Sequence, residues 1–250
     1  MAFGMVHEIA NRGYGVVPQY IDSKWFSGMD PVWFADNTYF DITTATTTNT
    51  ALMVGGIPAL VITATSATTD RWQAQYANGA AGAYNSLQLK AGKPVRLSGL
   101  FRTNAIGACE IQFGWSIIDT AVNAANTYSS EYFLVEKTAA ATSLKVRTSK
   151  AAGTALTSEC GGSALVSDNW YMIELILTRD ATTAGKGKWE VWLAGTMTPG
   201  FQGDQIGQGT FLTQFPDTAT TDLSPVAAIT NGDTAANVHY FGGMGWAVPL

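Results

Sequence analysis

The chain has 250 residues, of which 46% are hydrophobic and only 13% are charged, so it can bury one large core. The formal net charge of −5 and the lack of any Lys/Arg run exclude nucleic acid and anionic membrane as main partners. No stretch of 18 uninterrupted apolar residues predicts a membrane span. Because charged residues usually make up about a quarter of a soluble domain, this chain must cover its surface with small polar residues or bury it against partners.

Residues 1–34 combine aromatic side chains with Gly and Pro breakers and show no sustained helical or strand period. We expect an extended arm here, followed by one β-sandwich domain over residues 35–250. The arm either buries its aromatic side chains against its own domain or docks them on another subunit. Its start lacks the Lys/Arg and apolar stretches of a secretory signal, so we expect none.

Beyond the arm, short strands are predicted one after another. Thr-rich composition marks residues 39–50, and further strands are predicted at 58–65, 84–89, 95–103, 106–119, 131–137, 144–148 and 163–166. The alternation is clear in residues 106–119, where Phe113 and Trp115 share one face and Gln112 takes the other. No amphipathic helix of three turns and no fixed-period repeat is visible.

The strongest pattern is a hairpin at residues 168–195. Ile173, Leu175 and Leu177 share one parity while Glu174 takes the other, and Trp189, Val191 and Leu193 repeat the alternation after a turn-rich segment. A two-stranded hairpin needs a second layer over its apolar face. We therefore expect Leu175 in the core, where Asp would give insoluble protein, and Glu174 outside it, where Ala would be nearly neutral.

The segment 196–234 is dominated by Gly, Thr, Asp, Gln and Pro, so we expect it to run over the surface. Residues 236–248 then predict a closing strand, kinked or bulged by its glycines. Cys109 and Cys160 are predicted to be free buried thiols rather than a disulfide.

Patterns for catalysis and metal binding are missing. A retaining glycosidase needs two carboxylates about 5 Å apart, yet Glu110, Glu174 and Glu190 are each alone on a predicted strand and are better explained as solvent-facing side chains. The two histidines, His7 and His239, lie far apart and lack metal-ligand spacing. We assign no catalytic residue, no metal and no cofactor.

The strand order over residues 95–195 carries a family resemblance. From LSGLFRT through EIQFGWSIID, EYFLVEK, SLKVRTS and NWYMIELILTRD to KGKWEVWLAG, it resembles the concanavalin A-like jelly roll of legume lectins, laminin G modules and family-16 glycosidases. The resemblance implies an all-β fold, an antiparallel two-sheet sandwich. It gives no guide to activity, since that sandwich hosts lectins, hydrolases and virion proteins.

In overall style the chain resembles structural proteins of tailed-bacteriophage virions. Low charge, eight tryptophans and no catalytic set are similar to capsid decoration or cement proteins. This implies a non-enzymatic virion protein, assembled in the host cytoplasm, that binds the major capsid protein or other virion proteins. We expect a homo-oligomer, with a trimer favoured by analogy, and the proposed aromatic anchors of the arm are Trp25, Phe26, Trp33 and Phe34.

A carbohydrate-binding sandwich, as in a lectin or tail fibre, is the alternative function. Its candidate stacking residues are Trp72, Tyr128 and Trp192. Trp192 points away from Trp189 and Val191, so it either binds a sugar or packs in a subunit interface or under a loop. A divergent glycosidase is the third and least favoured alternative.

Overall fold

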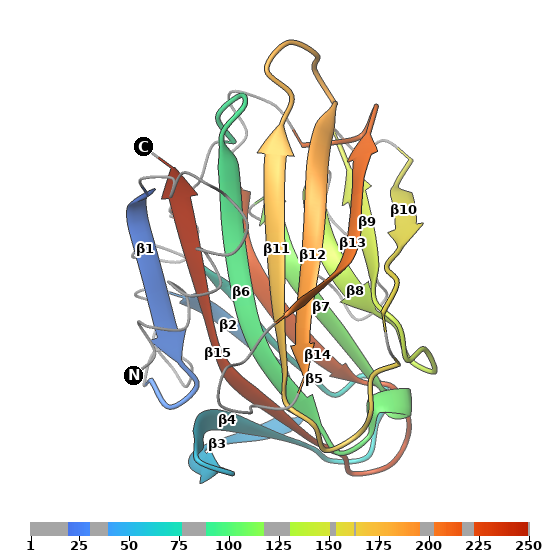
Figure 1. The fold of residues 1–250 in the computed structure, drawn as a ribbon. Coiled ribbons are helices and arrows are strands. Elements are labelled where there is room, and N and C mark those ends of the chain that lie inside the picture. The colour runs from blue at the N-terminus through green and yellow to red at the C-terminus, as the bar shows by residue number, and fades with distance from the viewer. Residues whose placement is uncertain are drawn as a thin grey trace.

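The computed structural model describes residues 20–30, 40–76, 89–117, 131–150, 154–162, 164–195, 203–216 and 223–249. These residues form two antiparallel β-sheets packed face to face, with one short 3-10 helix, η1 (Ile106–Ala108). Figure 1 shows the two layers. The predicted all-β sandwich is therefore confirmed.

The front sheet has eight strands within the described residues. In spatial order they are β13 (Asp204–Phe211), β12 (Gly187–Gly195), β11 (Tyr171–Arg179), β6 (Pro94–Thr103), β15 (Val238–Pro249), β4 (Ile57–Ala64) and β3 (Thr47–Val54), with β1 (Tyr20–Ser27) pairing with β15 as well. β12 and β11 are the predicted hairpin, and β13 lies at the edge beside them (Figure 1).

The back sheet has seven strands among the described residues. In spatial order they are β10 (Leu156–Glu159), β9 (Lys145–Ser149), β8 (Tyr132–Lys137), β7 (Cys109–Ile117), β14 (Leu223–Asn231), β5 (Arg71–Tyr76) and β2 (Phe40–Ala45).

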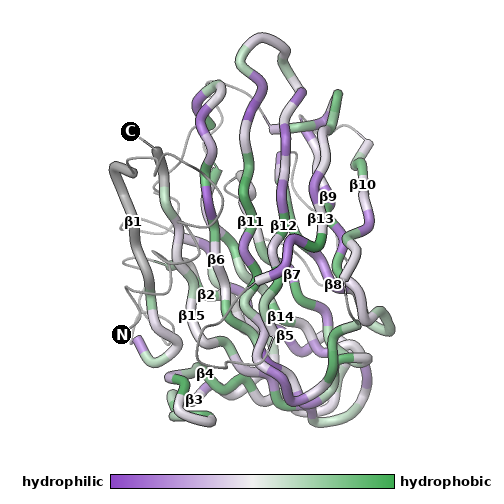
Figure 2. The backbone as a smooth tube through the Cα atoms, in the orientation of Figure 1, coloured by the Kyte–Doolittle hydropathy of each residue, from purple (hydrophilic) through white to green (hydrophobic). Residues whose placement is uncertain are grey.

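The core lies between the two sheets, because alternate residues of each strand face inward. Leu175 and Val191 of the front sheet and Phe113 and Phe133 of the back sheet are completely buried there. The predicted register of the hairpin is thus confirmed. Figure 2 shows the same alternation as hydrophobic and hydrophilic residues that follow one another along the strands.

Several predictions about individual segments are wrong. Residues 20–27 of the expected arm form β1, which pairs with β15 from Tyr20↔Pro249 to Ser27↔Gly243. The expected surface segment 196–234 contains two strands, β13 and β14. Residues 164–166 form no strand. Two further strands, β5 and β10, were not predicted.

Phe26 of β1 belongs to an aromatic cluster inside the molecule. Its ring centroid lies 5.1 Å from that of Phe40 and 5.6 Å from that of Trp246, and Tyr76 completes the cluster. Phe26 is partly buried and packs on the core of its own chain, which is the first of the two alternatives for the arm, while its role as a partner anchor stays a prediction. Residues 1–19 and 31–39, which include Trp33 and Phe34, lie outside the described residues.

Candidate functional site

The outer side of the front sheet carries the candidate site, on the two strands next to its free edge. In β12, Trp189 and Val191 face the core, so the residues between them face outward. The antiparallel register places Lys188 opposite Thr210 and Glu190 opposite Gln208. A register shift after Val191 then brings Trp192 opposite Gln205. We define the β12–β13 face as these outward residues: Lys188, Glu190, Trp192, Gln205, Gln208 and Thr210.

The side chains of this face are connected by hydrogen bonds. The Trp192 indole Nε1 donates to Glu190 Oε2 at 3.3 Å, and the Gln205 amide Nε2 donates to the same oxygen at 3.4 Å. Gln205 Nε2 also donates to Gln208 Oε1 at 3.3 Å. Trp192 is half-buried, while Gln205 and Gln208 are exposed. The face thus combines one held indole ring with an exposed set of donors and acceptors.

Two glycines let β13 lie close over the core at this edge. A Cβ at Gly207 or Gly209 would lie only 3.0 Å from the indole of Trp189, so a side chain at either position would push against that ring. The inward positions in this part of β13 are Gly207, Gly209 and Phe211, which are partly or fully buried, while Gln208 and Thr210 between them are exposed. The packing of the two glycines on Trp189 sets how closely β13 lies over the core, and so positions Gln205 and Gln208 on its outer side.

A hollow of about 620 Å³ opens at one end of the β12–β13 face. Its lining consists of Gly92, Thr178, Arg179, Asp180, Ala181, Lys186, Gly187, Lys188, Thr210 and Leu212. Lys188 and Thr210 belong to both the face and the hollow, so the two are continuous. Figure 2 shows hydrophilic ends of β6, β11 and β12 at this end of the molecule.

Asp180 organises the turn that borders the hollow. Its Oδ1 accepts hydrogen bonds from the backbone N–H groups of Thr182 and Thr183, each at 2.9 Å, and from the Thr182 hydroxyl. These bonds lower the pKa of Asp180 to about 2. Its other oxygen lies 3.8 Å from Lys186 Nζ. Asp180 is therefore a structural carboxylate that holds the β11–β12 turn.

The other predicted site residues have different surroundings. Trp72 is completely buried, so the prediction that it offers a surface for sugar is wrong. Trp25 lies on β1 opposite Gly245. Tyr128 is outside the described residues. Among the predicted stacking residues, Trp192 is the one that the described structure places at the surface.

The expectation of solvent-facing carboxylates fails for Glu174. Its side chain is buried and pairs with Arg96, Nη1 to Oε1 at 3.2 Å, and burial raises its pKa more than Arg96 lowers it. Glu136, on the outer side of the back sheet, is buried too and lies between Lys145 and Arg147. Alternation identified the face of each residue but not what covers that face.

A second buried polar group surrounds His239 near one end of the core. His239 Nδ1 and the Thr103 hydroxyl are 2.9 Å apart, and the fully buried Lys137 ammonium donates to the carbonyls of Ile106 and Cys109. Cys109 and Cys160 are buried free thiols, as predicted. Within the described ranges, no three His, Cys, Asp or Glu side chains are grouped to hold a metal ion, and no helix is long and apolar enough to cross a membrane.

Neither a family model nor a curated protein matches this chain. Solved structures do match it at low identity. The carbohydrate recognition domain of Emp47p gives a TM-score of 0.54 at 12% identity, covering 95% of this chain and 100% of that one. Peanut lectin, solved with a nine-residue peptide, gives 0.52 at 11% identity, covering 91% and 97%. An endo-β-1,4-glucuronan lyase from the fungus Trichoderma reesei gives 0.51 at 12% identity, covering 92% and 95%.

These similarities show the fold alone. The chain is a lectin-like, concanavalin A-like β-sandwich over most of its length, which confirms the fold part of the resemblance. The matched structures include lectins and lyases, so the fold does not distinguish binding from catalysis.

Proposed function

We propose that this protein is a non-catalytic carbohydrate-binding β-sandwich whose binding surface is the β12–β13 face. The observation that carries the proposal is the half-buried Trp192 ring held by Glu190 beside two exposed glutamines. A sugar ring has an apolar face and a rim of hydroxyl groups, so it needs one flat apolar surface and several nearby donors and acceptors. The carbohydrate-binding proteins among the matched structures lend support by fold.

The composition of the face supports binding rather than glycosidic cleavage. Glycoside hydrolysis by a pair of carboxylates needs a second acid about 5 Å from the first. Glu190 is the one acidic residue of the six, and its carboxylate is already bonded to Trp192 and Gln205. The nearest acid on the neighbouring strand is Glu174, opposite Trp192, whose pKa Glu190 helps to raise and which is held in an ion pair with Arg96. Both carboxylates are thus engaged, which favours recognition over cleavage.

A glycan array tests the proposal directly. We expect the purified protein to bind a subset of the arrayed glycans. Trp192→Ala should lose at least tenfold in affinity, because the sugar ring loses the indole on which it stacks. Trp192→Phe keeps an aromatic ring and should retain most of the binding. Both variants should unfold at nearly the wild-type temperature. Absence of glycan binding by the wild-type protein would refute the proposal.

A second candidate function is that of a capsid decoration protein, as the sequence predicts. Exposed apolar side chains on the β3–β4 hairpin support it: Leu52 and Met53 are each 54% exposed beside the Gly55–Gly56 turn. The hairpin lies at the end of the sandwich opposite the β11–β12 loop (Figure 1), so it could contact a shell while the other end faces outward.

Incubation with undecorated capsids of a candidate phage tests this second function. Saturation at a fixed copy number, lost in a Leu52→Ser and Met53→Ser double variant, is the expected result. Sedimentation of the free protein checks the proposed trimer. A protein that does not bind capsids would contradict both the decoration role and the proposed partner, the major capsid protein. A monomer in sedimentation would contradict the proposed trimer.

A further inference from the structure

We propose that the ligand of the β12–β13 face is an anionic glycan whose acidic groups bind in the adjoining hollow. This inference rests on the proposed function and adds the chemical class of the ligand. Three cationic side chains, Arg179, Lys186 and Lys188, line the hollow, against one acidic side chain, Asp180. The lining of the hollow is thus positively charged, although the chain as a whole carries a net charge of −5.

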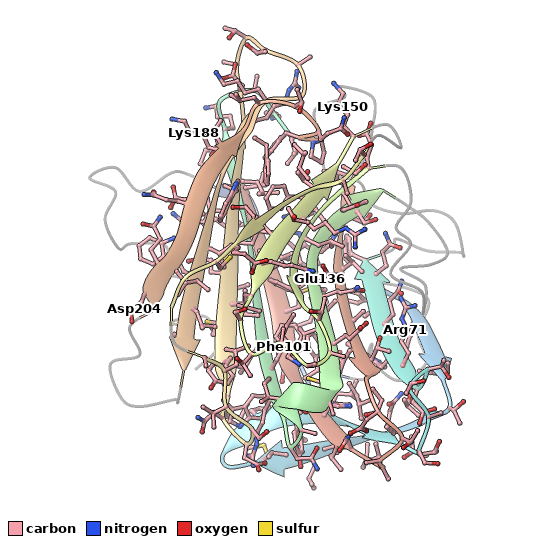
Figure 3. All side chains as sticks on the ribbon, turned by 90° about the vertical axis from the view of Figure 1, so that its right-hand side faces the viewer. Arg71, Phe101, Glu136, Lys150, Lys188 and Asp204 are labelled. Carbon is pink, nitrogen blue, oxygen red and sulfur yellow. The ribbon has the colours of Figure 1, made fainter. Side chains whose placement is uncertain are left out.

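The positive charge extends beyond the lining. Gly92 of the hollow lies in the turn that carries Lys90 and Lys93, and its N–H donates to the Arg179 carbonyl at 2.9 Å. Lys150 directly follows β9 of the back sheet, and its side chain lies within 4 Å of the Cβ position at Gly185 in the β11–β12 loop. Figure 3 shows Lys150 and Lys188 at the same end of the sandwich. Lys90 and Lys93 thus flank Gly92 in a turn that borders the hollow, and Lys150 lies beside the β11–β12 loop that carries Lys186.

Among the cations that line the hollow, Arg179 Nη1 donates to the Leu89 carbonyl at 3.3 Å, and Lys186 has Asp180 as an acidic neighbour. Asp180 approaches Lys186 only at 3.8 Å, and its other oxygen is occupied by Thr182 and Thr183. Lys188 is exposed on the face itself. Cations placed together in a concave, partly apolar site raise the local concentration of anions and favour their binding. Lys188 and Arg179 are thus placed to receive carboxylate or sulfate groups.

The spacing along β12 suits an extended ligand. Trp192 and Lys188 are four residues apart on one side of a strand, or about 13 Å at roughly 3.3 Å per residue. A chain of several sugar rings can therefore stack one ring on Trp192 and place an acidic group at Lys188. Gln208 lies between these points, opposite Glu190, with its amide exposed. The β12–β13 face can thus bind hydroxyl groups in its middle and an acidic group at the end that adjoins the hollow.

The experiment compares acidic and neutral glycans on the same array at low and at physiological salt. We expect the strongest signals from uronate- or sulfate-bearing glycans, falling as salt rises because surface charges are screened. A Lys186→Gln and Lys188→Gln double variant should lose at least tenfold on these glycans. The control, Arg102→Gln, removes a cation at the far end of β6 whose partner Asp168 is 61% exposed, and should keep wild-type binding.

Each outcome separates this inference from the proposed function. Binding of neutral glycans alone, lost in Trp192→Ala but unchanged in the lysine double variant, would refute the anionic ligand and leave the proposed function standing. Equal binding of polyglutamate and acidic glycans, insensitive to Trp192→Ala, would show a general polyanion site and also refute it. Absence of any glycan binding would refute both.

Discussion

Arg96 and Glu174 face each other on neighbouring strands on the outer side of the front sheet, with Nη1 and Oε1 3.2 Å apart and their side chains only 6% and 5% exposed. The pair lies on β6 and β11, whose register places Arg96 opposite Ile176, two residues from Glu174 and on the same side of the sheet. A charge removed from water this completely depends on its partner.

Replacing Glu174 with Ala should destabilise the protein by about 3–5 kcal/mol, because Arg96 would be left as a buried charge without this carboxylate. The sequence alone predicts a nearly neutral change. Chemical denaturation measures the free energy of unfolding. Asp168→Asn is the control: Asp168 pairs with Arg102 but is 61% exposed, so the loss should stay below about 1 kcal/mol. Equal effects of the two variants would contradict the buried pair.

The stability of the protein should fall in mild acid through His239. Burial and the nearby Lys137 ammonium lower the pKa of His239 to about 4, against about 6.5 in an unfolded chain. Between these values the unfolded state binds more protons, so stability is lost as pH falls from 6.5 toward 4. At pH 5 the loss from this group is about 2 kcal/mol.

The variant His239→Gln isolates that effect, because an amide can still bond to the Thr103 hydroxyl but does not titrate near pH 5. Unfolding free energies at pH 7.5 and pH 5 should differ by about 2 kcal/mol less in the variant than in the wild type. An unchanged difference would show that His239 is not the titrating group.

Adding a methyl group beneath β13 should cost stability. In Gly209→Ala the new Cβ would lie 3.0 Å from Trp189 Nε1, so the strand or the ring must shift, at a cost of about 1–3 kcal/mol. Gln208→Ala, one residue away and exposed, should be close to neutral in thermal unfolding. If Gly209→Ala is equally neutral, β13 does not rest on Trp189.

Truncation of Phe26 should weaken the fold rather than an interaction with a partner. Phe26→Ala removes a ring that packs on Phe40 and Trp246, with an expected loss of about 2 kcal/mol or more. Deleting residues 1–34 also removes β1 and should lower the unfolding temperature further. A fully stable truncated protein would contradict the place of β1 in the sheet.

The sequence predicted the fold where side chains alternate in polarity. Ile173, Leu175 and Leu177 gave the register of β11, since the period of two reports directly on which face is buried. β13 was missed because Gly207 and Gly209 stand at the inward positions, where an apolar side chain would have given the pattern. Its inward surface is supplied by Trp189 of the next strand.

The candidate site was predicted only in part, for a related reason. Trp192 was identified from its parity in one strand. Its partners Gln205 and Gln208 belong to a strand that composition assigned to a loop. The three cations that line the hollow, Arg179, Lys186 and Lys188, all belong to the predicted hairpin. The rest of the lining, Gly92 and the end of β13 at Thr210 and Leu212, comes from elsewhere in the chain, and no local pattern shows that the topology brings it there.

Every residue of β14 is buried, and the strand is bonded to β7 on one side and to β5 on the other. Pro225 fits because the pairing with β5 begins only at Val226, so a missing N–H there breaks no ladder bond on that side. Amide protons from Val226 to Thr230 should therefore exchange with solvent deuterium only when the whole domain unfolds. The sequence composition of residues 196–234 predicts a surface loop, yet β14 within it would then be among the last segments to unfold. The slowest amide exchange would be found in the middle of the back sheet.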